Sequence, residues 1–380
     1  MSMKKAIQPT SAEPIVSTYL NRKGIRLGLP VTGNFELTAR CNFDCRMCYV
    51  HLKGHSQELI KKELTAAQWL DIAKEAKDMG LIFLLLTGGE PFLRSDFPYI
   101  YEELIRMGIM VSINTNASLY NEEIRKLFHK YPPSRLNVTL YGGSEETYQS
   151  LCGNASFEKV TDSLRRMKED GLQIRLNVSL TPYNVQDMKE IDRISREIGL
   201  QAKAASYMYP PVRVTGEIGS NSARFTPEEA GKTIADWYYL RDDKERFLKR
   251  ANACRMHSDA GVTDICSDVE QEGVSCRAGR SSFWLTWDGR MLPCGTMDIE
   301  SSNVLEKGFA ESWEEVRSRV SAIRLPKECS GCDLRHNCGV CAANCKTETG
   351  YFDHKPEYLC KMTQCTGKHI LELADQIDKH

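Results

Sequence analysis

The stretch Asn34-Phe-Glu-Leu-Thr-Ala-Arg-Cys41-Asn-Phe-Asp-Cys45-Arg-Met-Cys48 places three closely spaced cysteines directly after a short apolar strand, Asn34–Thr38. Three thiolates on one loop can hold three irons of a 4Fe–4S cluster and leave the fourth iron open. One alternative is a structural zinc site, which needs four protein ligands, and no fourth lies nearby. The other is a cysteine loop without metal. The C-x3-C-x2-C spacing favours the cluster.

Outward from this loop, short apolar runs alternate with segments of helical periodicity. Apolar or β-branched runs, expected to be strands, occur at Asn34–Thr38, Leu81–Thr87, Met110–Asn114, Leu136–Tyr141, Ile174–Thr181 and about Gln201–Tyr207. The predicted helices are Thr65–Met79, Asp96–Met107, Asn121–Lys130, Phe157–Asp170 and Val185–Ile198. Strands that alternate with helices predict a parallel α/β domain, here a partial (β/α)6 TIM-like barrel. Its ligand sites are expected at the C-terminal ends of the strands.

A second motif, Thr87-Gly88-Gly89-Glu90-Pro91, follows the second predicted strand. Two glycines let a ligand approach the backbone, and a carboxylate there can pair with an α-amino group. Alone, such a motif is more often a structural turn. Its position one βα unit after the cysteine loop makes the combination specific.

Together, CNFDCRMC and GGEP resemble the radical S-adenosylmethionine (radical SAM) superfamily. The resemblance implies that Cys41, Cys45 and Cys48 hold a 4Fe–4S cluster whose open iron binds S-adenosylmethionine, and that a 5′-deoxyadenosyl radical then takes hydrogen from a substrate. It also implies a set of cofactor-binding residues. Gly88, Gly89, Glu90 and Pro91 would contact the methionine amino group, Met47 and Tyr49 the adenine, and Asn114, Asn116, Thr139 and Tyr141 the ribose side.

Cysteine usage is uneven along the chain: of fifteen cysteines, eleven lie between positions 254 and 365. This distribution favours metal ligation over a disulfide scaffold. The block reads Cys276, Gly289-x4-Cys294, Cys329-x2-Cys332-x5-Cys338-x2-Cys341-x3-Cys345, Cys360 and Cys365. A zinc ribbon would use only four of these thiols, whereas two 4Fe–4S clusters need eight.

The second block resembles the SPASM (twitch-type) extension found behind the barrel in a subgroup of radical SAM enzymes. It departs from that pattern at Cys338-Gly-Val-Cys341, where three intervening residues are usual, so either Cys341 or Cys345 is the returning ligand, and Cys341 is favoured. The resemblance implies a nearer cluster on Cys276, Cys294 and Cys341, with Cys266, Cys254 or no residue as fourth ligand. A farther cluster would be held by Cys329, Cys332, Cys338 and Cys360. We interpret Cys152, Cys345 and Cys365 as small buried residues or unassigned thiols.

Composition limits the class of protein further. Lys and Arg total 50 and Asp and Glu 51, a net charge of −1 that gives no electrostatic reason to expect a nucleic-acid or membrane-surface partner. No apolar run is long enough to span a bilayer, and the N-terminus lacks a signal-peptide core, so a cytoplasmic protein is expected. The predicted organisation is an N-terminal arm (1–33), a radical SAM partial barrel (34–215), a helical linker (216–265, with a helical run Thr226–Arg250), a SPASM auxiliary-cluster domain (266–365) and a C-terminal helix (366–380).

The resemblance to peptide-modifying maturases favours radical modification of side chains in a ribosomally made peptide, as a thioether or other crosslink. Sulfatase-type oxidation of Cys or Ser is an alternative, but Gly295 stands where those enzymes usually carry an aspartate base, and the nearest carboxylate is Asp298, a weak candidate catalytic residue. Two further alternatives are an enzyme that dehydrogenates a small molecule and a non-enzymatic iron–sulfur electron carrier. The 33 residues before the first strand are too few for a leader-binding domain, so a separate leader-binding protein, or none, is expected. A flavodoxin or ferredoxin would be the reductant.

Overall fold

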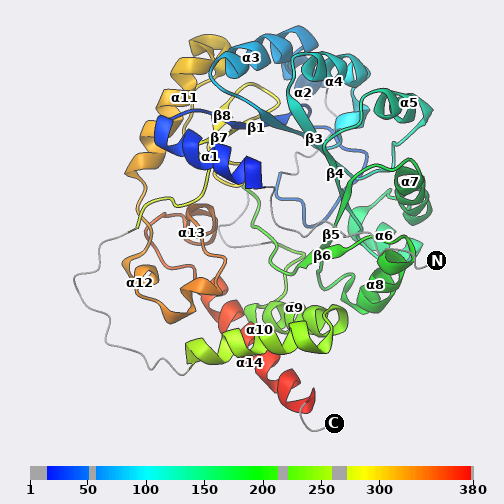
Figure 1. The fold of residues 1–380 in the computed structure, drawn as a ribbon, viewed down its shortest axis with the longest axis vertical. Coiled ribbons are helices and arrows are strands. Elements are labelled where there is room, and N and C mark those ends of the chain that lie inside the picture. The colour runs from blue at the N-terminus through cyan, green and yellow to red at the C-terminus, as the bar shows by residue number, and fades with distance from the viewer. Residues whose placement is uncertain (1–14, 51–56, 213–220, 259–271, 378–380) are drawn as a thin grey trace, which may run out of the picture.

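The computed structural model describes residues 15–50, 57–212, 221–258 and 272–377. Its centre is an eight-stranded sheet in the order β6-β5-β4-β3-β2-β1-β7-β8, in which every neighbouring pair is parallel except β7 and β8 (Figure 1). The strands are β1 (Thr32–Glu36), β2 (Phe83–Thr87), β3 (Met110–Thr115), β4 (Arg135–Thr139), β5 (Ile174–Ser179), β6 (Ala202–Ala205), β7 (Ser282–Leu285) and β8 (Met291–Leu292). The predicted α/β fold with a parallel sheet is confirmed.

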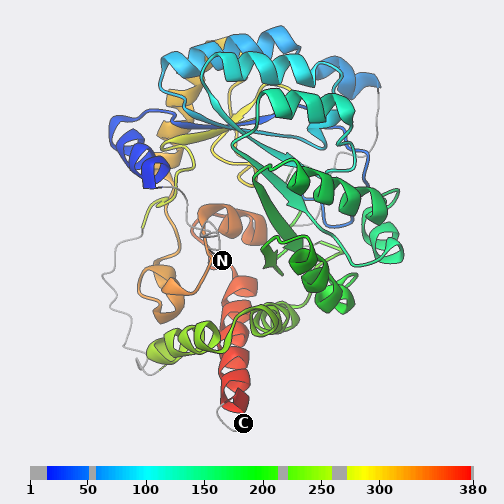
Figure 2. The ribbon, with the colours of Figure 1, turned by 45° about the vertical axis from the view of Figure 1, so that its right-hand side comes forward.

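Helices that follow the first five strands cover the outer face of the sheet (Figure 2). They are α3 (Ala66–Asp78), α4 (Phe97–Arg106), α5 (Glu122–Lys130), α7 (Phe157–Glu169) and α8 (Met188–Glu197), with short elements α2 (Gln57–Lys62), η1 (Pro91–Leu93), α6 (Glu145–Cys152) and η2 (Val185–Asp187) between them. Thr65 begins α3 with a capping box, in which its hydroxyl accepts from Gln68 N–H and the Gln68 side chain accepts from Thr65 N–H. All five predicted helices are present, and α6 was not predicted.

The sheet extends beyond the predicted barrel segment. β7 and β8 come from the cysteine-rich part of the chain, and β7 adds to the sheet beside β1. Helix α11 (Val304–Ala322) then packs beside α3, and its buried Trp313 donates from Nε1 to the carbonyl of Gly28 (2.8 Å), which follows α1 (Ile15–Leu27). The cysteine-rich region is therefore joined to the parallel sheet through β7 and β8 and through the packing of α11 on α3.

The remaining helices lie beyond the open side of the sheet (Figure 1). They are α9 (Pro227–Arg241), α10 (Lys244–Ser258), α12 (Lys327–Ser330), η3 (Asp333–His336), α13 (Ala342–Thr349) and α14 (Glu357–Ile377). The predicted helical run Thr226–Arg250 is two helices, separated at Asp242. The predicted C-terminal helix begins earlier than residue 366, and α14 packs along both α9 and α10.

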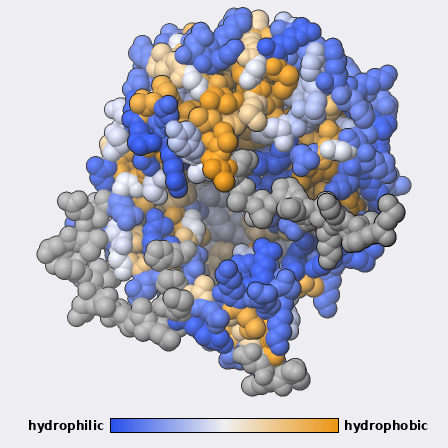
Figure 3. Space-filling view, viewed as in Figure 1, coloured by the Kyte–Doolittle hydropathy of each residue, from blue (hydrophilic) through white to orange (hydrophobic). Residues whose placement is uncertain are grey.

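Figure 3 shows the molecule from the same side as Figure 1. On this face the surface is hollowed between the half that contains the sheet and the half that contains α10 and α14. No described helix is long and apolar enough to cross a membrane.

Candidate radical SAM site

The three-cysteine loop leaves the C-terminal end of β1 and is fastened to the end of α6. Asp44 N–H donates to the carbonyl of Cys152 (2.9 Å) and Arg46 N–H to that of Leu151 (2.9 Å). Cys41, Cys45 and Cys48 are all partly exposed. The loop thus presents three thiols at the edge of the sheet where ligand sites of parallel α/β domains gather.

Burial raises the pKa of Cys41 to about 12, with smaller contributions from the charges of Glu90, Cys45 and Cys48. A hydrogen bond with the Cys152 thiol and burial together raise the pKa of Cys45 well above its ordinary value. A cysteine thiol must lose its proton before it can bind a metal. At these raised pKa values, the positive charge of a bound metal has to stabilise the thiolates. Among the described residues, no three His, Cys, Asp or Glu side chains form a group able to hold one metal ion. In a 4Fe–4S cluster each thiolate binds a separate iron, so this donor set fits a cluster better than zinc.

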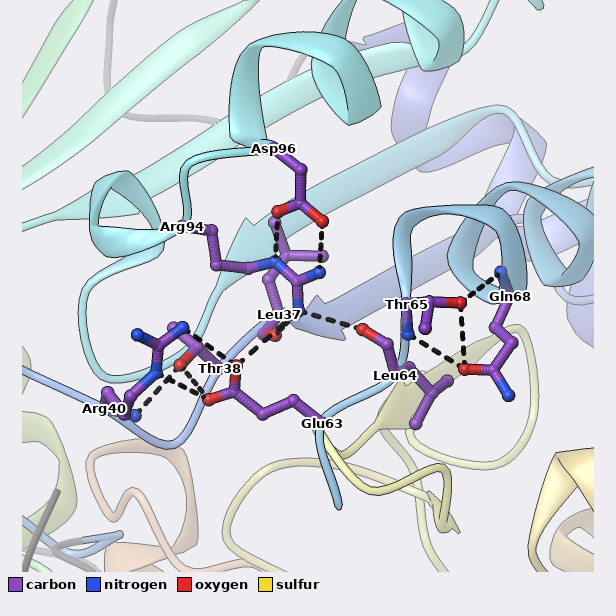
Figure 4. A network of polar contacts seen from close by, with 9 residues as sticks. All are labelled: Leu37, Thr38, Arg40, Glu63, Leu64, Thr65, Gln68, Arg94 and Asp96. Carbon is purple, nitrogen blue, oxygen red and sulfur yellow. Dashed lines mark hydrogen bonds and ion pairs between the residues drawn. The ribbon is translucent and has the colours of Figure 1, made fainter. Parts of the chain in front are cut away.

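A network of charged groups holds the backbone that leads into the loop (Figure 4). Glu63 accepts from Thr38 Oγ1 and from both Nε (3.0 Å) and Nη2 (2.9 Å) of Arg40. Arg94, 7% exposed, donates from Nη1 to the carbonyls of Leu37 (2.8 Å) and Leu64 (3.0 Å), and lies 3.8 Å from Glu63. The network fixes the residues directly before Cys41.

Replacing Arg94 by Met is expected to lower the free energy of unfolding by about 3–5 kcal/mol, because it removes one partner of a buried ion-pair network and leaves two buried carbonyls without their donor. Urea unfolding under anaerobic conditions measures the change. Arg106→Met, at the end of the helix α4 that follows Arg94, is the control: its side chain is 57% exposed and pairs with Glu102 and Glu103, so the substitution should change stability by about 0–1 kcal/mol. Equal effects of the two substitutions would contradict the structural role of Arg94.

The glycines of the GGEP motif let the cysteine loop itself approach the end of β2. A Cβ on Gly88, whose φ is +148°, would lie 2.5 Å from the carbonyl oxygen of Thr38. A Cβ on Gly89 would lie 2.1 Å from the carbonyl oxygen of Arg40 and 2.9 Å from the Cys41 nitrogen. Glu90 N–H donates to the same Arg40 carbonyl (2.8 Å). In addition to any ligand they admit, these glycines make room for the backbone that carries the first cysteine.

Gly89→Ala is therefore expected to displace Cys41 and to reduce both iron at the N-terminal site and S-adenosylmethionine cleavage by at least tenfold, since backbone cannot yield as a flexible side chain can. Iron analysis and 5′-deoxyadenosine release measure the two effects. Gly273→Ala is the control, because its Cβ would meet nothing closer than 3.7 Å. Wild-type activity of the Gly89 variant would show that the loop tolerates the shift.

Glu90 lies under the loop and joins it to β3. Its wholly buried carboxylate accepts from Phe92 N–H (3.1 Å), Thr115 Oγ1 (2.9 Å) and Asn116 N–H (2.8 Å). Burial raises its pKa to about 7, against the lowering effect of these three donors. A carboxylate has about four acceptor positions, so one is left for a ligand such as an ammonium group. Pro91 begins the 3-10 turn η1 that follows.

The other predicted cofactor-binding residues lie at different depths around the loop. Asn116 Nδ2 donates to Asn42 Oδ1 (2.9 Å) and lies 3.9 Å from Cys41 Sγ, whereas Asn114, within β3, hydrogen-bonds with Thr87 (3.5 Å) and Asn137 (2.8 Å) on the neighbouring strands. Tyr141 is held behind the loop, where burial, followed by the charges of Cys45 and Cys152, raises its pKa and the hydroxyl of Thr139 lowers it. Met47 is buried. The Tyr49 ring lies 6.1 Å from that of Tyr209, after β6.

The C-terminal thiols form two sets. Cys341, at the start of α13, has a pKa raised by burial and, to a smaller extent, by the charges of Cys294 and Cys276, so these two thiols lie within electrostatic reach of it. Burial and then the charges of Cys360, Cys338 and Cys332 raise the pKa of Cys329 to about 11. These last four thiols line one cavity of about 90 Å³. The structure thus brings together thiols that were assigned to the same cluster, and their role as cluster ligands stays a prediction.

The remaining cysteines are distributed as follows. Cys345 is wholly buried on α13, where burial and then the charges of Cys329, Cys341 and Cys338 raise its pKa to about 12. Cys254 lies on α10, and the charged group that acts on its pKa is Arg250, not a cysteine of the nearer set. Cys266 lies outside the described residues. Asp298, the weak candidate base, is paired with Arg290 (3.0 Å).

Two residues near the sites were not predicted. Cys152 was interpreted as an ordinary buried residue, yet its thiol contacts Cys45. Tyr209 lies between the two sites: its ring faces Tyr49, and after burial the charges of Cys341 and Cys294 are what raise its pKa. No motif in the sequence around either residue predicts these contacts, because each contact depends on how segments distant in the sequence pack together.

Comparisons with known proteins agree with this architecture. The family model of the Radical SAM superfamily matches residues 35–194. The chain is 25% identical to the AdoMet-dependent heme synthase of Methanosarcina barkeri over 339 residues, covering 85% of this chain and 94% of that protein. It is 31% identical to a probable GTP 3′,8-cyclase of Metallosphaera sedula over 287 residues, covering 74% of this chain and 86% of that protein.

Two solved structures share the fold. Streptococcus suis SuiB bound to its precursor peptide SuiA matches with a TM-score of 0.63 at 17% identity, over 95% of this chain and 84% of that one. The enzyme anSMEcpe with bound AdoMet matches with a TM-score of 0.66 at 16% identity, over 92% of this chain and 95% of that one. A parallel α/β sheet with a three-cysteine loop at its ligand-binding edge is thus combined with a cysteine-rich C-terminal region. The chain belongs to the radical SAM superfamily.

Proposed function

We propose that this radical SAM enzyme modifies a cysteine-bearing, ribosomally made peptide and links its thiol to a carbon atom. A 4Fe–4S cluster on Cys41, Cys45 and Cys48 would supply the electron that cleaves S-adenosylmethionine to a 5′-deoxyadenosyl radical. The observation that supports the proposal is that the charges of Cys294 and Cys276 both act on Cys341. We assign no cluster ligand role to Cys345, which responds to Cys329 and Cys338 as well as to Cys341, and Cys266 lies outside the described residues. We therefore propose that the nearer cluster is held by Cys276, Cys294 and Cys341. A cluster held by three thiolates has an open iron, and a substrate thiolate is a suitable ligand for it.

Sulfatase-type oxidation is disfavoured at Gly295. A Cβ there would lie 2.9 Å from the indole ring of Trp284, whose Nε1 donates to Glu36 (2.9 Å). An aspartate base at this position would require the indole to move. Asp298 is engaged by Arg290, so this region offers no ready substitute for that base among the described residues.

A small-molecule substrate is the second candidate. It is favoured by the similarity to AdoMet-dependent heme synthase, which extends over 94% of that protein. We also propose a flavodoxin or ferredoxin as reductant and, if the peptide carries a leader, a separate leader-binding protein.

A mass-spectrometric assay tests the proposal. With S-adenosylmethionine and dithionite, a cysteine-bearing peptide encoded beside this gene should lose about 2 Da per modification. The 5′-deoxyadenosyl radical would take one hydrogen atom from a peptide carbon, and the thiol would lose its proton to solvent. Bonding of the thiolate to the carbon radical would then form the C–S bond and release one electron, which the auxiliary cluster would accept. The crosslinked sulfur, now a thioether, should resist alkylation. A hydrazine-reactive aldehyde would instead support sulfatase-type oxidation, and turnover of a non-peptide substrate alone would support the second candidate.

A further inference from the structure

A cavity of about 850 Å³ lies between α9, α10, α14 and the loops that carry the auxiliary cysteines. Its apolar wall includes Ile234, Leu359, Met362 and Ile370. Four of its lining residues are cationic: Arg246, Lys249, Arg250 and Lys368. None of the described residues that line it is acidic. Asp242, which does not line the cavity, pairs with both Arg246 (3.1 Å) and Arg250 (2.9 Å). Its single negative charge therefore balances only one of these two positive charges. Lys249 has no ion pair within the described part of the chain.

Gly367 gives an independent indication that this space is kept open. It lies inside α14 and lines the cavity. Glycine is the poorest helix former after proline, so a glycine within a helix usually has a packing reason. Gly231, on α9, has such a reason, because its Cβ would lie 2.6 Å from the carbonyl oxygen of Met362. A Cβ on Gly367 would meet nothing within 4 Å. A larger side chain there would point into free space.

The cavity is long, and its inner end reaches the auxiliary thiols. Along α14 its lining runs from Leu359 to Leu371, or about 18 Å at a rise of about 1.5 Å per residue. An extended segment of about five residues has nearly this length. Tyr209 and Asn344 line the inner end, and Asn344 Oδ1 lies 2.7 Å from Cys341 Sγ. A chain that enters along α14 is thereby led to the nearer auxiliary set.

We infer that this cavity binds an extended segment of the peptide substrate that combines apolar side chains with carboxylates. The inference rests on the proposed function and names the part of the enzyme that recognises the peptide. The apolar wall buries aliphatic side chains, and the cationic residues attract carboxylates and steer the segment toward the cavity. The length of the cavity favours an extended chain over a compact ligand.

Binding to the anaerobically reconstituted enzyme tests the inference without turnover. The probe is fluorescein-labelled Leu-Glu-Leu-Glu-Leu-Glu, followed by fluorescence anisotropy, with the Gln-for-Glu peptide as its uncharged partner. We expect the acidic peptide to bind at least tenfold more tightly than the uncharged one. Lys249→Glu should weaken acidic-peptide binding at least tenfold, and Gly367→Phe should abolish it by filling the cavity. Lys244→Glu is the matched control, because Lys244 is exposed on the same helix but does not line the cavity.

Uncoupled release of 5′-deoxyadenosine should be unchanged in all three variants, which shows that they fold and load their N-terminal cluster. Equal losses of binding in Lys244→Glu and Lys249→Glu would reduce the effect to general surface charge and overturn the inference. So would Lys249-dependent binding of protoporphyrin IX, an apolar ring system with two carboxylates, when neither peptide binds. A Lys249→Glu enzyme that binds and modifies its peptide normally would remove the cavity assignment and leave the proposed function intact.

Discussion

Replacing Cys41, Cys45 and Cys48 together by alanine is expected to abolish the reductive cleavage of S-adenosylmethionine, while the C-terminal clusters remain. The three thiols are carried by one loop, which hydrogen-bonds to the end of α6 and is held by Glu63 and Arg94, far along the chain from the auxiliary cysteines. The triple variant has no thiol left on this loop. Cys152, which contacts Cys45, is a single thiol and cannot hold a cluster by itself. 5′-Deoxyadenosine release in the presence of dithionite measures the loss.

Cys152→Ala is the matched control for the triple substitution. It removes a thiol that contacts Cys45 but does not lie on the loop. This variant should retain its iron and most of its cleavage activity, since alanine keeps the site small and apolar. Continued 5′-deoxyadenosine formation by the triple variant would contradict the assignment of this cluster as the start of the chemistry.

Much of the architecture was predictable because its signals are local. The run Leu81–Thr87 is almost wholly apolar, which predicts burial, and it is short, which favours a strand over a helix. The structure places β2 at Phe83–Thr87. The predicted helices that begin at Thr65 and Asn121 are α3 and α5, and both residues cap them with their side chains. The addition of β7 to the sheet beside β1 was not predictable in this way. It pairs segments about 250 residues apart, as in the hydrogen bond from Asn34 Nδ2 to the carbonyl of Phe283.

The site shows the same division. Spacing alone groups Cys41 with Cys45 and Cys48, because ligands a few residues apart on one loop have to lie close together. The role of Gly89 was only partly predictable: the motif indicates close approach, but the structure shows that the approaching group includes the Arg40 carbonyl. The cavity beside α14 has no sequence motif, because it arises where three helices and a cysteine loop meet.

Anaerobically reconstituted protein is expected to contain about twelve irons per chain, at four for each of three clusters. The prediction follows from the grouping of the thiols. The loop set is separate from Cys276, Cys294 and Cys341, and a further four thiols surround a cavity of about 90 Å³. Besides the thiols, this cavity is lined by two cationic side chains, Arg335 and Lys355, and one carboxylate, Glu328, an excess of positive charge that suits an anionic thiolate cluster.

Removing Cys332, Cys338 and Cys360 together should lower the iron content to about eight and abolish peptide modification, because one thiolate cannot hold a cluster. Uncoupled cleavage of S-adenosylmethionine should persist, since the N-terminal loop is untouched. Cys365→Ala is the control: it lies on α14, one and a half turns beyond Cys360, and does not line the cavity of the farther set. Mössbauer spectra and iron analysis measure the change. About four irons in the wild-type protein would mean that the C-terminal thiols hold zinc or no metal, and would remove the auxiliary cluster on which binding of a substrate thiol depends.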